Sequence, residues 1–246
     1  MKSIDRLLGC LNKDAPLKEV IVGAFQTAVA LDSEPPRCGL SSSLTTDHHH
    51  DHTHPSVSNA GNLLQTTARG LADGLHSSSW LEASIGMAAL NALLDVDEDD
   101  CAEVNAREII LERGADRRVA IVGHFPFVDR VRREARESWV LELNPCPSDE
   151  PADRAGDIIP KADVVALSGT TLINHTFDEL MKLCRPDAYV LLLGASTPLT
   201  PLLFECGVDA VCGTVVSDIE GALRAIRQGA SYRQIPGRRA LTMIKD

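Results

Sequence analysis

Residues 118–126 have the sequence Arg-Val-Ala-Ile-Val-Gly-His-Phe-Pro, in which a short apolar run ends at a glycine and a proline follows shortly after. The apolar run predicts a buried strand. Pro126 predicts the first turn of a helix, where a missing backbone N–H has no cost. A strand that passes into a helix at a glycine is the repeating unit of parallel α/β sheets. The segment therefore predicts an α/β fold.

The same alternation continues to the end of the chain. Continuous apolar strands between helices predict a parallel sheet that is buried on both faces, as in Rossmann-like domains. We expect strands at 118–123, 139–143, 163–167, 189–193 and 209–212, helices at 126–137, 177–184, 200–206 and 218–228, and an edge strand at 239–244.

The first half of the chain has a different pattern. Residues 18–31 predict one strand or two short ones, and residues 37–45 predict a strand that pairs antiparallel to it. Helices are expected at 59–75 and 78–94. Strands followed by helices indicate a small α+β domain. We therefore expect two domains, residues 1–110 (α+β) and residues 111–246 (Rossmann-like α/β).

Charge and hydropathy exclude several classes of protein. The formal net charge of the 246 residues is −11, and the acidic excess lies in the first half of the chain. Nucleic acids and anionic membranes are bound through excess positive charge, so neither is expected as a partner. No apolar run is long enough to span a membrane, and the first residues lack the apolar core of a signal peptide. We expect a cytoplasmic protein.

The seven cysteines are scattered and odd in number, and no two have the C-x-x-C spacing. This pattern argues against a disulfide framework or a zinc ribbon. We expect most of the cysteines to be small, buried, apolar residues.

Glycine and hydroxyl side chains follow most of the predicted parallel strands. Gly123, Gly169, Gly194 and Gly213 lie at or just after the ends of four of them. In an open α/β sheet these carboxyl ends form one edge, and ligands bind there. Each loop alone could simply be a turn or a helix cap. Four such loops at the same edge of the sheet favour a ligand site.

Nucleotide binding is a weaker expectation for this edge. The G-x-G-x-x-G fingerprint is absent after Gly123, and the sequence contains no G-x-x-x-x-G-K-[ST] phosphate loop. Glu142 lies 19 residues beyond Gly123, about where a ribose-binding acid would fall. A nucleotide-like cofactor such as S-adenosylmethionine or NAD is therefore the alternative, with Glu142 as its candidate contact.

A histidine-rich block occupies residues 47–54. In an extended chain its alternate histidines would share one face, and on a helix they would form i,i+4 pairs. Either arrangement could bring two or three imidazoles to a divalent metal such as zinc, nickel, copper or iron. A solvated loop is the other interpretation. The candidate metal ligands are His48, His50, His52 and His54.

Two polar residues stand out in the predicted helix 78–94. Ser79 and Glu82 have the spacing of a capping box, and Asn91 lies in an apolar stretch. Glu82 and Asn91 are nine residues apart, so they point to opposite sides of a straight helix. A buried Asn needs partners, so Asn91 is either a clamp to a neighbouring loop or a site residue.

Two further histidines require placement. His124 leaves the first predicted parallel strand at the ligand edge, and it is a candidate acid, base or metal ligand. It could equally be hydrogen-bonded to a neighbouring loop. For His175 we expect an exposed position at the start of a helix.

Several stretches together resemble the uncharacterised bacterial and archaeal heavy-metal chelation family. The resemblance covers most of the chain, and the motif set is specific although no single motif is. The stretches are Ser79-Trp-Leu-Glu-Ala-Ser-Ile-Gly-Met-Ala-Ala-Leu-Asn-Ala92, Gly123-His-Phe-Pro126, Leu167-Ser-Gly-Thr-Thr-Leu-Ile-Asn174, Leu193-Gly-Ala-Ser-Thr-Pro-Leu199 and Gly213-Thr-Val-Val216.

The resemblance implies an N-terminal domain like that of enolase, a Rossmann-like C-terminal domain, and a ligand site in the cleft between them. Its implied ligand is a metal ion or a metal chelate. Apart from the resemblance, we expect a small molecule or a metal as the partner and allow for a homodimer. The implied cleft residues are Glu82, Asn91, His124, Gly169, Thr170, Thr171, Asn174, Ser196, Thr197 and Gly213.

Three functions remain open at this point. The first is the handling of a metal ion or chelate, and the second is a Rossmann-type enzyme that uses a nucleotide-like cofactor. The third is a module that binds a small anion without catalysis. The sequence leaves open whether the protein is an enzyme.

Overall fold

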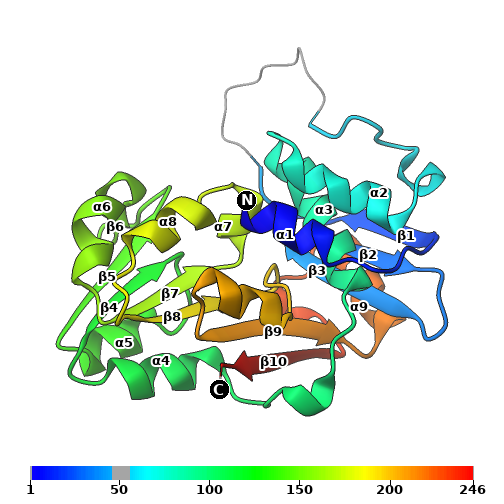
Figure 1. The fold of residues 1–246 in the computed structure, drawn as a ribbon. Helices are drawn as coiled ribbons and strands as arrows, with labels where there is room; N and C mark the ends of the chain where they lie inside the picture. The colour runs from blue at the N-terminus through cyan, green and yellow to red at the C-terminus, as the bar shows by residue number, and fades with distance from the viewer. Residues whose placement is uncertain (1, 46–55, 246) are drawn as a thin grey trace.

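The computed structural model describes residues 2–45 and 56–245, which form a large and a small sheet with helices packed around them (Figure 1). The large sheet has seven strands, which pair in the order β10 (Arg238–Ile244), β9 (Ala210–Val216), β8 (Tyr189–Leu193), β7 (Val164–Ser168), β4 (Arg118–Val122), β5 (Glu137–Glu142) and β6 (Glu150–Pro151).

The large sheet is mostly parallel, as the sequence predicts. Every pair of neighbouring strands is parallel except β9 and β10, which pair antiparallel from Arg238 opposite Val216 to Ile244 opposite Ala210. Counted from β4, the first six strands in the chain have the Rossmann order 3-2-1-4-5-6. The order reverses between β4 and β7, and this is the place where such sheets bind ligands.

Alternate side chains of the parallel strands enter two separate apolar layers. Val119 and Ile121 of β4 pack with helices α4 (Ala106–Gly114) and α5 (Val128–Glu134). Ala120 lies on the other face, with the layer that contains residues of helices α6 (Ala155–Ile158), α7 (Thr170–Ile173) and α8 (Phe177–Leu183). Helices thus cover both faces of the sheet (Figure 1).

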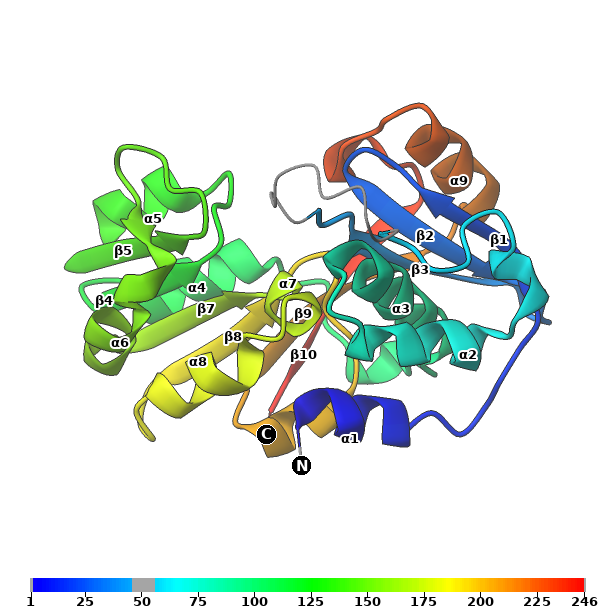
Figure 2. The ribbon, with the colours of Figure 1, turned by 90° about the horizontal axis from the view of Figure 1, so that it is seen from above.

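The small sheet is antiparallel and has three strands, β1 (Leu17–Val22), β2 (Gln26–Leu31) and β3 (Arg37–Ser42). Helix α3 (Trp80–Leu93) packs on one face, and helix α9 (Ile219–Arg227) lies on the other (Figure 2). Helix α9 belongs to the second half of the chain, so the two halves share a core. Helices α1 (Ser3–Gly9) and α2 (Ala68–Ala72) complete this part.

One predicted helix is wrong. Residues 59–75 do not form a continuous helix, because the chain turns at Gly61, whose φ is +89°, and starts again after Thr67, whose side chain accepts the Gly70 N–H. The segment contains only α2 and 3-10 turns at Leu63–Gln65 and Asp73–His76. The helix expected at 200–206 is present as a 3-10 helix over Pro201–Cys206.

Several elements have no counterpart in the sequence-based prediction, among them α1, α4 and β6. Strand β6 has only two residues, which is too short to leave a periodic signal. Among the residues that the structure describes, no helix combines the length and apolar character needed to cross a membrane.

Candidate functional site

A cleft opens at the carboxyl ends of β4, β5 and β7, at the point where the strand order reverses. Its volume is about 410 Å³, and it is lined by residues of both sheets and of α3. The lining consists of Ser42, Leu44, Trp80, Val122, Gly123, His124, Phe125, Leu141, Glu142, Leu143, Ala152, Ala155, Ser168, Thr170, Thr171, Asn174, Thr176 and Leu180.

The polar side of the cleft comes from the loops that follow the strands. Glu142 Oε1 accepts the backbone N–H of His124 at 2.5 Å, which joins the loops after β5 and β4. The Thr170 hydroxyl donates to Ser168 Oγ at 2.8 Å. Asn174 Oδ1 accepts the Thr176 hydroxyl at 2.7 Å. These bonds fix the direction of each polar group before any ligand arrives.

The cleft also has an apolar wall. Trp80 and Leu44 come from the first half of the chain, and Leu143 is a large apolar side chain that remains 53% exposed. The Phe125 ring stacks on Phe127, with ring centroids 5.3 Å apart. The cleft therefore combines a polar edge of carboxylate, imidazole and hydroxyl groups with an apolar wall.

A cluster of potential metal ligands adjoins this cleft at His124. His124 Nδ1 lies 2.8 Å from Asp149 Oδ2, and one ligand atom each from His124, Cys146 and Asp149 lie within 4.8 Å of one another. Arg132 is paired with Asp149 Oδ1 at 2.8 Å. Desolvation acts to raise the pKa of Asp149, but the hydrogen bonds from His124, Arg132 and the Cys146 amide outweigh it and hold that pKa below its usual range.

The structure brings together only part of the candidate set. His124, Thr170, Thr171, Asn174 and Glu142 all line the cleft. The helix α3 also contributes to it, but through Trp80 and not through the residues that the sequence favours.

Glu82 and Asn91 lie on opposite sides of α3, as their spacing requires. Glu82 accepts the Ser77 hydroxyl at 2.6 Å and the Ser58 N–H at 3.2 Å, in a separate hollow. It does not reach back to Ser79, so the expected capping box is only half formed. Asn91 Nδ2 donates to Leu40 O at 2.8 Å and to Ala195 O at 3.5 Å, as a clamp between the halves of the chain.

The remaining candidates hold loops together. Ser196 Oγ accepts the Ser42 N–H at 2.8 Å. A Cβ on Gly169 would lie 2.6 Å from Thr197 Oγ1, and one on Gly213 would lie 2.7 Å from Thr197 O. The Thr197 hydroxyl is buried without a hydrogen-bond partner in the described structure. These residues therefore pack the strand ends tightly beside the cleft. The metal candidates His48, His50, His52 and His54 lie outside the described residues.

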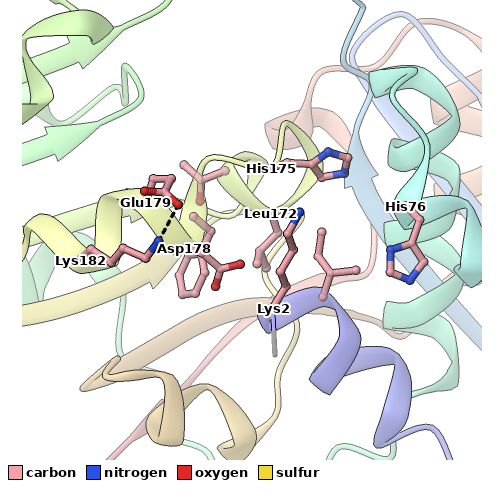
Figure 3. Close-up of a pocket in the computed structure, with 10 residues that line it drawn as sticks. Lys2, His76, Leu172, His175, Asp178, Glu179 and Lys182 are labelled. Atoms are coloured by element: carbon pink, nitrogen blue, oxygen red, sulfur yellow. Dashed lines mark hydrogen bonds and ion pairs between the residues drawn. The ribbon is translucent and has the colours of Figure 1, made fainter.

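A second cavity of about 470 Å³ lies between α1, α7 and α8 (Figure 3). His175 has a left-handed backbone, with φ of +64°, and its Nε2 lies 2.8 Å from Leu75 O. Lys182 is paired with Glu179 at 2.7 Å, and Asp178 accepts the hydroxyl and N–H of Ser3. Most ionisable groups of this cavity thus have a partner on the protein.

The expectation that most cysteines are buried is wrong. Of the seven cysteines, all of which the structure describes, only Cys38 and Cys212 are buried, and desolvation raises their thiol pKa values to about 12 and about 11. Cys146 is exposed. Neither Cys146 nor Asp149 is among the site residues expected from the sequence, although the segment Cys146-Pro-Ser-Asp149 has the proline that favours a tight turn.

Comparisons with known proteins match the two halves of the chain to two family models that have the same description. The family model described as "Putative heavy-metal chelation" (DUF364) matches residues 105–245, and a second model with that description (DUF4213) matches residues 4–94. An uncharacterised protein of Methanocaldococcus jannaschii is 27% identical over 164 residues, which cover 64% of this chain and 63% of that protein.

Two solved structures have a similar fold, and both are DUF364 proteins of unknown function. The protein from Desulfitobacterium hafniense is 24% identical, with a TM-score of 0.81 over 98% of this chain and 96% of that one. The protein from Pyrococcus horikoshii is 19% identical, with a TM-score of 0.80 over 98% of each chain. At these levels of sequence identity, the structural similarity shows the fold alone.

Proposed function

Because the chain belongs to the heavy-metal chelation family, we propose that it binds a metal as a complex with a small organic molecule. The complex occupies the cleft at the carboxyl ends of β4, β5 and β7. The metal is the cargo of this site. The division of the chain at residue 110 is kept as part of the proposal. Ser42, Leu44 and Trp80 of the first domain line the cleft together with residues of the second domain.

The size and lining of the cleft carry this proposal. A bare ion needs only a few ligand atoms at about 2.0–2.6 Å. A volume of about 410 Å³ falls instead in the range of about 300–1,000 Å³ that holds small organic ligands. An apolar wall with a few oriented polar groups is also typical of such sites.

Each side of the cleft has a separate task in this proposal. Trp80, Leu44 and Leu143 cover the organic part of the complex. The oxygen of the Thr170 hydroxyl accepts a hydrogen bond from the polar part of the complex, since its proton is donated to Ser168. The Glu142 carboxylate favours a ligand with positive charge. The imidazole of His124 offers a nitrogen to the metal.

Protein purified without a tag or a metal column from its native lysate tests the proposal. We expect elemental analysis and mass spectrometry to find a metal and one organic molecule in equal amounts. Leu143→Ser removes part of the apolar wall, so the retained ligand should bind about 3–10-fold more weakly, as for partial loss of a buried leucine.

Leu64→Ser is the matched control, because Leu64 is 55% exposed and does not line the cleft. It should leave the retained ligand unchanged. An equal loss of the retained ligand in Leu143→Ser and Leu64→Ser would contradict the proposal. A metal that is retained without any organic molecule would also contradict it.

The alternative of a nucleotide-like cofactor is weakened by Glu142. Its carboxylate already accepts the His124 N–H, where the first loop of a dinucleotide site would meet the pyrophosphate. The same negative charge disfavours a small-anion module. A thermal-shift screen with S-adenosylmethionine, NAD and inorganic phosphate checks both alternatives, since clear stabilisation by one of them would favour that ligand.

A further inference from the structure

We propose that His124, Cys146 and Asp149 form a three-ligand site for a thiophilic divalent cation of the Zn²⁺ class at the rim of the cleft. Each residue offers one ligand atom: a ring nitrogen of His124, Sγ of Cys146 and a carboxylate oxygen of Asp149. We assign Nδ1 as the His124 ligand because it lies 2.8 Å from Asp149 Oδ2. The inference rests on the proposed function, because it gives the metal of the complex a defined position.

The donor set selects the class of metal. Thiolate favours zinc and other soft or borderline ions, and imidazole suits zinc, copper, iron and nickel. Calcium and magnesium prefer oxygen ligands only, and they fit this set poorly. Three protein ligands with a free position are also the pattern of zinc sites that accept a further ligand.

The backbone places the three ligands with little freedom. Cys146 and Asp149 are the first and last residues of one turn, in which the Asp149 N–H donates to Cys146 O at 2.9 Å. The Cys146 N–H returns a bond to Asp149 Oδ2 at 3.3 Å. His124 approaches from the loop after β4, and its own N–H is held by Glu142 at 2.5 Å.

The three ligand atoms need to move only slightly to reach the separations of a metal site. In a tetrahedral site with bonds of about 2.0–2.3 Å, neighbouring ligand atoms are about 3.3–3.6 Å apart. One ligand atom from each of the three residues already lies within 4.8 Å of the other two. The Cys146 side chain is in an exposed turn and can rotate inward, whereas Nδ1 of His124 and Oδ2 of Asp149, now 2.8 Å apart, must open slightly.

The residues around Asp149 orient its carboxylate for metal binding. The Asp149 side chain has no exposed surface, and Arg132 holds its Oδ1 at 2.8 Å. Oδ2 is therefore the oxygen that faces His124. Outer bonds of this kind orient metal ligands in many sites. On binding, the thiol proton and the Nδ1 proton leave for solvent or, for the imidazole, for Nε2.

His124 is the residue that joins this site to the cleft, since it belongs to both. A metal bound by the three ligands would lie at the cleft edge. Its remaining coordination positions could then accept donor atoms of an organic ligand in the cleft.

Titration of the full-length chain with Co²⁺ alone, under reducing conditions, tests this site. The five block histidines are changed to Asn in every sample so that they cannot compete: His48, His49, His50, His52 and His54. We expect one Co²⁺ per chain and a thiolate-to-cobalt charge-transfer band. Cys146→Ser should abolish the band and weaken binding at least about 100-fold, because loss of even an outer-shell partner costs about 10–100-fold.

Cys101→Ser is the matched control, because Cys101 is a partly exposed thiol beside Asp97 and Glu98. It should keep the band and the affinity. His124→Ala should weaken Co²⁺ binding while the band of any remaining complex persists. Co²⁺ binding without the band, or a band that survives Cys146→Ser, would overturn the site.

Failure to bind Co²⁺ at all would also overturn the three-ligand site. The proposed function would survive that result if protein from native lysate still carried a metal with an organic molecule. Absence of both would contradict the two proposals together.

Discussion

At the scale of single residues, Asp163 shows how one carboxylate can hold two strands in register. It precedes β7 and accepts the backbone N–H of Arg118 at 2.9 Å and its guanidinium at 2.8 Å. Arg185 adds a third donor at 3.1 Å. These contacts lie at the amino ends of β4 and β7, at the opposite edge from the cleft. They fix the pair of strands between which the cleft opens.

Asp163→Asn should lower the free energy of unfolding by about 1.5–3 kcal/mol at pH 7, the range for hydrogen bonds to a charged group. The hydrogen bonds from Arg118 hold the pKa of Asp163 far below its usual range. The carboxylate thus stabilises the fold above the unfolded-state pKa of about 3.9, and this contribution is lost as the pH falls toward the folded-state pKa.

Urea unfolding at several pH values measures this effect. The difference between the wild type and Asp163→Asn should be constant from about pH 7 to pH 5 and shrink below about pH 4. Asp187→Asn removes a 75% exposed partner of Arg185 and should change stability by no more than about 0.5 kcal/mol. A difference that grows on acidification would refute this account.

The cluster of His124, Cys146 and Asp149 could be predicted only in part from the sequence. His124 could be placed at the ligand edge because it follows an apolar strand and a glycine. Its partners Cys146 and Asp149 could not be assigned, because they follow a different strand and the two loops meet only when β4 and β5 pair. Neither the spacing of these residues in the sequence nor the composition predicts how far His124 lies from Cys146 and Asp149.

At the scale of elements, the contact between β3 and α3 depends on a residue without a side chain. Gly39 lies in the middle of β3, where a Cβ would come within 2.1 Å of Ala88 O and 2.3 Å of Ala92 N. The strand and the helix therefore approach more closely than any other residue would allow. This contact positions Trp80, at the start of α3, over the cleft.

Gly39→Ala should push α3 away from β3 and lower the stability by at least about 1–3 kcal/mol, as overpacking does. Gly156→Ala is the control, because Gly156 has no atom within 4 Å of its Cβ position. Thermal unfolding of both variants measures the difference. Equal melting temperatures would show that the two elements can separate freely.

Other elements were predictable for a simple reason. The apolar strands and most of the helices of the large sheet are visible in the sequence because burial on both faces demands continuous apolar runs. Helix 59–75 was wrong because small polar residues and glycine permit turns as readily as a helix. The structure resolves that choice through the cap at Thr67.

At the scale of the whole molecule, α9 links the two halves of the chain. Ala222, Leu223 and Ile226 of α9 pack with Ile21 and Leu40 of the small sheet, and all five are buried. The outer face of the small sheet is thus covered by a helix that lies nearly 200 residues further along the chain. The cleft has two walls of fixed relative position because of this shared core.

Residues 1–110 expressed alone should fail to form the stable three-stranded sheet, because the apolar face beneath α9 would be exposed to water. We expect strong binding of a hydrophobic dye and no cooperative thermal transition. The full chain, measured in parallel, should unfold cooperatively with little dye binding. A fragment that unfolds cooperatively and binds no dye would show that α9 is dispensable.

By itself, the sequence determined the α/β class, the order along the chain of every large-sheet strand except β6, and the edge at which the proposed ligand site lies. These features follow from local periodicity and from glycines at strand ends. The tertiary structure alone decided which candidates share one cleft, since Glu82 and Asn91 are separated by α3 while His124 and Thr170 meet. It alone joined His124 to Cys146 and Asp149, because such distances are set by strand pairing and core packing, which no local pattern encodes.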